Sequence, residues 1–158
     1  MIPASARAII EPHQCRPPID VMAVAADFGV KIYSARLAKD VSGVLMRNDS
    51  YGAPSGFVIY VDRDEPSVRQ RFTAAHELGH YVLHRDCIGD RVEDNYLLRS
   101  AGLSNRQEVE ANKFAADLLM PMHLIKVAME NGPYAPRELA EQFQVSELAM
   151  SIRLGLVT

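Results

Sequence analysis

Apolar side chains recur at helical spacing along residues 64–89, and this stretch carries the clearest periodic pattern in the chain. The acidic pair and the proline at 64–66 are typical of a helix start, and Gly89 offers a stop. The pattern therefore predicts one long, buried helix. Its apolar positions are Val68, Phe72, Ala75, Gly79, Val82 and Leu83. Because a glycine inside a helix costs about 1 kcal/mol relative to alanine, Gly79 predicts close packing against a neighbouring element.

Shorter patterns predict the remaining elements. Alternating residues at 30–33 and short apolar runs at 44–46 and 57–61 predict strands, with turn residues between the last two. Helices are predicted at 3–10, 19–28, 108–119, 136–143 and 147–154. Residues 90–103 are irregular and predict a loop with a short helical piece. The order of these elements predicts an α+β fold, in which a small antiparallel or mixed sheet is followed directly by the long helix.

Composition and charge limit the classes of protein to which the chain can belong. A chain of 158 residues with 48% hydrophobic and 23% charged residues is long enough to bury a core as one compact unit. Its net charge of −3 gives no general attraction to nucleic acid or to an anionic membrane, and no apolar run approaches the length of a membrane span. Cys15 and Cys87 form no disulfide framework, which fits a reducing compartment. We expect a cytoplasmic protein without a direct nucleic-acid or membrane partner.

The long helix carries candidate chemistry at its centre. His76 and His80 are four residues apart, so a helix places both imidazoles on one face, where they can bind a single zinc ion. Glu77, beside the first histidine, can reach the metal-bound water. Two ordinary core or surface histidines are the alternative interpretation. The burial and the periodicity of this helix favour the metal site.

A catalytic zinc ion usually has three protein ligands, so a third ligand is expected. His84 continues the i, i+4 series, but it lies about 12 Å from His76 along the axis, too far for one ion to bind both. We expect His84 to be partly exposed near the helix end. The metzincin pattern also fails, because Leu83 and Asp86 occupy its glycine and histidine positions. The third ligand must come from elsewhere in the chain.

Two separated motifs stand out, RFTAAHELGHYVLH at 71–84 and EANKFAADLLMP at 110–121. Together they resemble the ImmA/IrrE family of metallopeptidases. The resemblance implies a helical, gluzincin-like zinc site in a bacterial protein. It also implies that the glutamate before Ala-Asn, Glu110, is the third ligand. Glu108 is the fallback two residues earlier, although a glutamate in the first turn of a helix ordinarily serves the helix dipole.

The resemblance further implies a function in gene regulation. Members of the family cleave a helix-turn-helix repressor of the XRE type and so relieve repression in a stress or mobile-element response. On this sequence, His76, His80 and Glu110 would hold Zn²⁺, and Glu77 would act as the general base. Iron and manganese remain alternatives to zinc.

Four further side chains are candidates for supporting roles. Tyr81, Tyr96 and His123 are candidates for stabilising the oxyanion, and packing or surface positions are the alternative for each. Asp117 lies seven residues after Glu110 on the same helical stripe and could orient a ligand histidine, or it could be a solvated surface aspartate.

The tail has the outline of a helix-turn-helix unit, with helices at 136–143 and 147–154. Its acidic residues outnumber its arginines, whereas contact with phosphates requires a basic face, so we expect it to serve in packing or partner docking. We therefore predict a zinc metallopeptidase domain at 1–133 and a C-terminal helical extension of the same unit at 134–158. The alternative function is a repressor-binding module with a structural metal. The presence of Glu77 favours the peptidase, because a structural site needs no general base.

Overall fold

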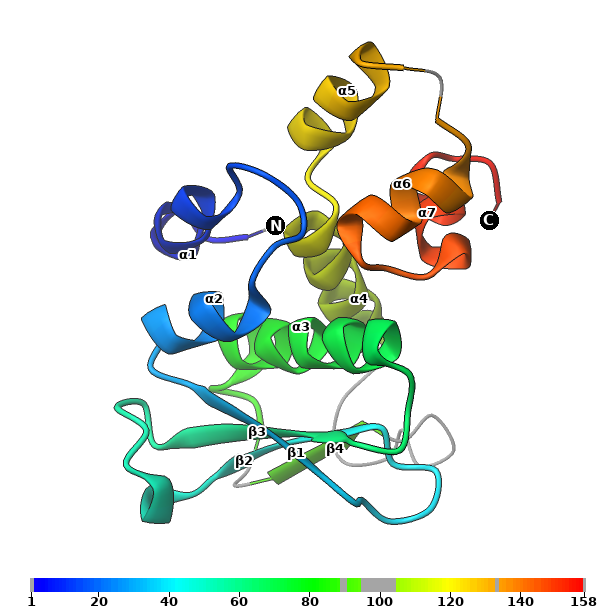
Figure 1. The fold of residues 1–158 in the computed structure, drawn as a ribbon. Coiled ribbons are helices and arrows are strands. Elements are labelled where there is room, and N and C mark those ends of the chain that lie inside the picture. Colours follow the sequence, from blue (N-terminus) through cyan, green and yellow to red (C-terminus); the bar gives the residue numbers. More distant parts are fainter. Residues whose placement is uncertain (1, 89–90, 95–104, 133, 158) are drawn as a thin grey trace.

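The computed structural model describes residues 2–88, 91–94, 105–132 and 134–157. A sheet forms one layer, helices α2 and α3 lie side by side on it, and the other helices lie mainly on the far side of α3 (Figure 1). The helices are α1 (Ala4–Ile10), α2 (Val21–Asp27), α3 (Ser67–His84), α4 (Asn105–Leu119), α5 (Met122–Glu130), α6 (Pro136–Phe143) and α7 (Glu147–Arg153). The strands are β1 (Lys31–Ala35), β2 (Gly43–Arg47), β3 (Phe57–Asp62) and β4 (Arg91–Asp94). This arrangement confirms the α+β class.

The sheet is mixed, with strand order β1-β3-β2-β4 among the described residues. β1 pairs in parallel with β3, and β2 pairs in antiparallel fashion with both β3 and β4. The prediction of a loop at 90–103 was wrong for β4. The segment Arg-Val-Glu-Asp has a single apolar residue, so its hydrophobic pattern gives no indication of a strand, and backbone pairing with β2 defines it instead.

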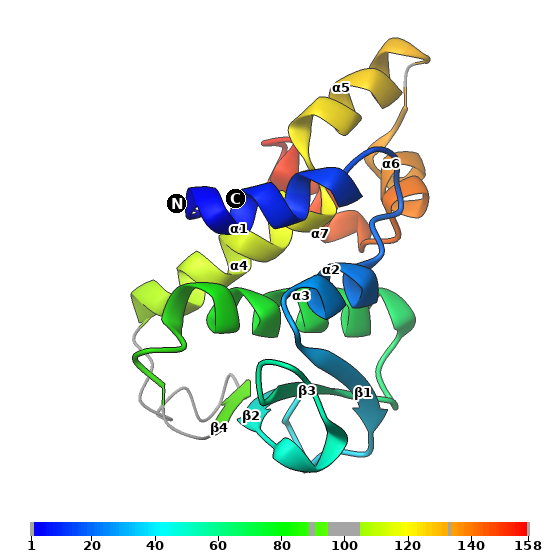
Figure 2. The same ribbon diagram turned by 90° about the vertical axis from the view of Figure 1, so that its left-hand side faces the viewer.

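Helix α3 is enclosed at its centre. Every residue from 73 to 80 is buried, because β2 and β3 pack on one side of the helix and α4 packs on another. The predicted apolar stripe is only partly correct, since Val68, Phe72, Val82 and Leu83 lie in the half-buried ends of the helix. In Figure 2, α4 crosses α3 obliquely on the side away from the sheet. The centre of α3 therefore buries polar as well as apolar side chains.

Gly79 lies directly against Phe114 of α4. A Cβ atom at this position would lie 3.0–3.2 Å from side-chain atoms of Phe114 on α4. Such contacts are shorter than ordinary van der Waals separations. The close approach predicted from a glycine inside the helix is confirmed.

The C-terminal helices α6 and α7 form at the predicted positions, whereas α5 was not predicted. Arg71 of α3 donates hydrogen bonds to the backbone oxygens of Gln144 and Phe143, at 3.0 and 3.4 Å. Arg153 of α7 donates to the Met120 oxygen at 2.9 Å. These bonds attach the C-terminal helices to α3 and to the end of α4. No helix in the described part of the chain is long and apolar enough to cross a membrane.

We expect Phe114→Ala to destabilise the protein by about 3–5 kcal/mol, because the fully buried ring fills the space between α3 and α4. Val109→Ala on the same helix is the control. Its side chain is 65% exposed, so the expected change is within about 0.5 kcal/mol. Urea unfolding of both variants measures the difference. Similar losses in the two would contradict the close packing of these helices.

Candidate metal centre

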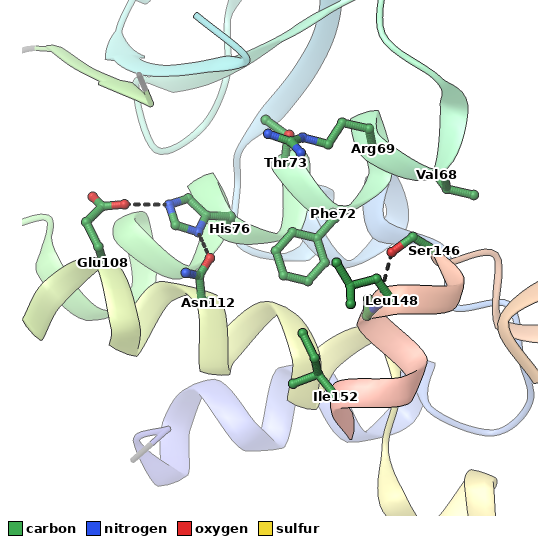
Figure 3. Close-up of a pocket in the computed structure, with 11 residues that line it drawn as sticks. Val68, Arg69, Phe72, Thr73, His76, Glu108, Asn112, Ser146, Leu148 and Ile152 are labelled. Atoms are coloured by element: carbon green, nitrogen blue, oxygen red, sulfur yellow. Dashed lines mark hydrogen bonds and ion pairs between the residues drawn. The ribbon is translucent and has the colours of Figure 1, made fainter. Parts of the chain in front are cut away.

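Three side chains from α3 and α4 converge on one point. His76 Nε2 and His80 Nε2 lie 3.1 Å apart, and each lies 3.1–3.2 Å from an oxygen of Glu108. Figure 3 shows the carboxylate of Glu108 directed at the ring of His76. Donor atoms about 2.1 Å from one tetrahedral ion lie roughly 3.4 Å apart, so these separations are close to those of a metal site. The three residues lie close enough together to bind a metal ion.

The structure brings Glu108, rather than Glu110, to the histidines. Glu110 instead contacts His84 at 2.9 Å and Arg106 at 2.8 Å. A helix turns about 100° per residue, so positions 108 and 110 of α4 face directions roughly 200° apart and cannot both point at one site. The geometry therefore replaces Glu110 with its fallback, Glu108, as the candidate third ligand.

His84 does not lie where the sequence analysis expected it. It is buried, with 4% of its surface exposed, and its Nδ1 lies 3.0 Å from Nδ1 of His80. Its Nε2 lies 2.9 Å from Glu110. His84 thus stands behind the cluster as a link between His80 and Glu110. The prediction of a partly exposed residue was wrong, because packing of α4 over the end of α3 covers the ring.

Asn112 makes the equivalent contact behind His76, with its Oδ1 2.8 Å from His76 Nδ1. It lies four residues after Glu108, so both face the same side of α4. Partners on the far ring nitrogen fix the orientation of a metal-binding histidine and direct its other nitrogen at the ion. Asn112 was missed by the sequence analysis. Its i, i+4 relation to Glu108 was the available indication.

Glu77 is fully buried beside the start of β2. A Cβ atom on Gly43 would lie 2.5 Å from Thr73 Cγ2 and 3.2–3.3 Å from Glu77 side-chain atoms. The absence of a side chain at Gly43 therefore lets the strand backbone lie directly against Glu77. This contact connects the carboxylate beside the histidines to the sheet.

The charge states of the cluster suit a cation. Burial tends to raise the pKa of Glu108, but hydrogen bonds with His76 and His80 outweigh it and hold the pKa well below its ordinary value. Burial lowers the pKa of His80, against an opposing hydrogen bond with Glu108. An ionised carboxylate and an uncharged imidazole are the forms that bind metal ions.

The structure does not bring the other candidates to the cluster. The Tyr81 hydroxyl lies 3.5 Å from the Phe28 oxygen, and His123 contacts the Gln14 oxygen at 2.9 Å. Asp117 pairs with Arg153 at 2.9 Å rather than with a ligand histidine, because it faces the C-terminal helices. Tyr96 lies outside the described residues. Asn112 and His84, and not Asp117, contact the Nδ1 atoms of His76 and His80.

The sequence profile of the IrrE N-terminal-like domain, a peptidase family, matches residues 25–155. The radiation response metalloprotease IrrE of Deinococcus radiodurans is 34% identical over 107 residues, which is 66% of this chain. Those residues cover 32% of that relative, so the chain spans about a third of its length.

A solved structure with a similar fold is a Mycobacterium tuberculosis transcriptional regulator. The TM-score is 0.64 at 20% sequence identity, over 96% of this chain and 45% of that one. At this level of identity, the likeness shows the fold alone.

Mutating a residue that contacts a metal ligand typically lowers metal affinity 10- to 100-fold. Glu108→Gln should lower it by more, because it removes the charged donor of the cluster itself. Glu110→Gln is the matched control on the same helix, and its loss should stay within that range. Titration of the metal-free proteins with Zn²⁺ measures both affinities. A larger loss in Glu110→Gln would restore the ligand that the family resemblance implied.

Gly43→Ala should destabilise the protein by about 1–3 kcal/mol, because the new methyl group would overlap Thr73 and press on Glu77. Gly132→Ala is the control, since a Cβ there would meet its nearest neighbour at an ordinary 3.6 Å. Thermal and urea unfolding measure both. If the two variants are equally stable, then β2 does not lie against α3 as closely as the geometry indicates.

Proposed function

Because this chain belongs to the IrrE N-terminal-like domain family, we propose that it is a zinc-dependent endopeptidase that hydrolyses a peptide bond in a partner protein. One observation carries the proposal. His76, His80 and Glu108 converge within 3.2 Å of one another, and buried Glu77 lies in the same turn of α3. That combination is the ligand set of a catalytic metal together with a general base.

His76, His80 and Glu108 would hold the ion in this proposal. Two imidazoles and one carboxylate with an open fourth position suit zinc. When bound, the metal supplies Lewis-acid chemistry, which activates a water molecule and polarises the peptide carbonyl. Asn112 and His84 keep the two imidazoles aimed at the ion through their contacts with Nδ1 of each ring.

Glu77 would act as the general base and then as the general acid. Its carboxylate takes a proton from the attacking water and passes it to the amine of the leaving peptide, so that one water is consumed for each bond broken. The Gly43 backbone lies beside this side chain, because an added Cβ there would be 3.2–3.3 Å from Glu77 atoms. Removing the proton-accepting oxygen should therefore stop hydrolysis without removing a ligand.

The substrate main chain would pair with a sheet edge, as extended peptides commonly do. The edges of the described sheet are β1 and β4. β4 pairs directly with β2, whose Gly43 lies against Glu77, whereas β1 is separated from β2 by β3. The edge at β4 is thus nearer to the proposed general base and is the better candidate for the peptide.

The partner we propose is a helix-turn-helix repressor of the XRE type, whose cleavage in the cytoplasm would relieve repression in a stress or mobile-element response. The family resemblance of both motifs supports it, as does the name of the Deinococcus relative, a radiation response metalloprotease. In this proposal, residues 1–133 form the peptidase domain and 134–158 are a helical extension of the same unit.

The second candidate is a repressor-binding module with a structural metal. Structural zinc sites usually have four protein ligands, whereas the described residues bring three to this cluster. A structural site also has no use for a buried carboxylate in the position of Glu77. Both observations favour the peptidase.

Glu77→Gln should bind Zn²⁺ like the parent but cut at least about 100-fold more slowly, because general base catalysis contributes roughly 10²–10⁴-fold. Glu130→Gln, at an exposed position on α5, is the matched control and should cut normally. The assay follows cleavage of a purified XRE-type repressor from the same genome by mass spectrometry, with metal content measured in parallel. If the zinc-loaded parent binds the repressor but leaves it intact, the binding-module function replaces the peptidase.

A further inference from the structure

A cavity of about 350 Å³ opens directly beside the metal centre. His76, Glu108 and Asn112 line one end of it. The other end lies between α3 and α7 (Figure 3). The remaining lining residues are Val68, Arg69, Phe72, Thr73, Ser146, Leu148, Ala149 and Ile152. The cavity thus runs from the proposed catalytic end to a wall built by α7 and by Ser146, which precedes it.

Four polar side chains that line this cavity have partners within the protein. Glu108 contacts both histidines, and Asn112 contacts His76. Arg69 pairs with Glu65 at 3.3 Å, and Ser146 Oγ accepts a hydrogen bond from the Ala149 amide. The end away from the metal centre is left mainly with the hydrocarbon of Phe72, Leu148 and Ile152, as Figure 3 shows. Such a surface favours an apolar side chain over a charged one.

The wall on α7 is firmly positioned yet open to a ligand. Met150 is fully buried beneath it, and Arg153 bonds Asp117 and the Met120 oxygen, each at 2.9 Å. Leu148 and Ile152 nevertheless remain 61% and 51% exposed. Large apolar residues left open beside a catalytic cleft are typical of a binding subsite.

We propose that this cavity receives the side chain of the substrate residue next to the scissile bond and selects a large apolar one, such as leucine, isoleucine, methionine or phenylalanine. Helix α7 is then a specificity wall of the peptidase site. The inference rests on the proposed function, because a peptide carbonyl at the His76 end places a neighbouring side chain in the cavity. This proposal gives α7 a role in substrate selection. The excess of acidic residues in the tail argues against contact with nucleic acid but is compatible with this role.

The test uses binding, so that it does not depend on hydrolysis. The probes are the hydroxamates of N-acetyl-leucine, N-acetyl-glycine and N-acetyl-aspartate, which chelate zinc and differ only in the neighbouring side chain. Calorimetric titration of the zinc-loaded protein should find the leucine probe at least about tenfold tighter than the glycine probe, since burying an isobutyl group is worth that factor or more. The aspartate probe should bind no tighter than the glycine probe.

Variants assign the selectivity to the wall on α7. Leu148→Ser and Ile152→Ser should reduce the leucine-to-glycine ratio toward one and leave the affinity for the glycine probe unchanged. Both positions are largely exposed, so the variants should fold, and thermal unfolding checks this. Leu156→Ser is the matched control, because Leu156 is 64% exposed and does not line the cavity.

The possible results distinguish failure of this inference from failure of the proposed peptidase function. Equal binding of the three probes, or a leucine preference that survives in both wall variants, overturns the inference alone. A leucine preference lost in those variants, in a protein that cuts no repressor, supports the subsite and contradicts the peptidase function. Failure of every probe to bind the zinc-loaded protein overturns the inference, and cleavage of the repressor then decides the peptidase function separately.

Discussion

The contact between α3 and α4 is the constraint on which the candidate site depends. α3 supplies both histidines and Glu77, whereas α4 supplies Glu108 and Asn112. Gly79 lets the helices approach until a single added carbon would press on the Phe114 ring. Since the donor atoms must lie within a few tenths of an ångström of ligand geometry, a wider separation of these helices would take Glu108 out of reach.

Burial of so many polar groups at the centre of α3 requires compensation. Thr73, His76, Glu77, His80 and His84 are all nearly inaccessible to solvent. Buried polar groups are costly unless they are hydrogen-bonded, and partners from α4 meet this cost for the histidines. His76 has Asn112 behind it, and His80 has His84 and then Glu110. The same contacts that satisfy the imidazoles also fix the direction in which each ring presents its Nε2 atom.

The C-terminal helices α6 and α7 have a sequence pattern whose role depends on where they lie in the fold. Their order, helix, short turn and helix, is the outline of a DNA-binding unit, yet they carry more acidic than basic residues. In the fold, α7 is bonded to the end of α4 through Arg153, and its apolar side chains line the cavity beside His76. The Arg153 bond and the apolar side chains of α7 thus place this unit beside the candidate metal centre.

The sequence by itself determined whatever depends on neighbours in the chain. The periodic pattern located α3, and the four-residue spacing of His76 and His80 placed both rings on one face, because helix geometry alone fixes those relations. The α+β class followed in the same way from the order of patterns. Even the close approach at Gly79 could be inferred, because glycine destabilises a helix interior and close packing against another element explains its presence there.

Only the tertiary structure decided relations between distant segments. That Glu108 rather than Glu110 lies beside His76 and His80 depends on how α4 is rotated against α3. The burial of His84 and the contact of Asn112 depend on the same packing. Strand β4 exists through pairing with β2, and the cavity exists because α7 returns to α3. Local periodicity carries no information on these contacts, since each is set by how two separately formed elements pack.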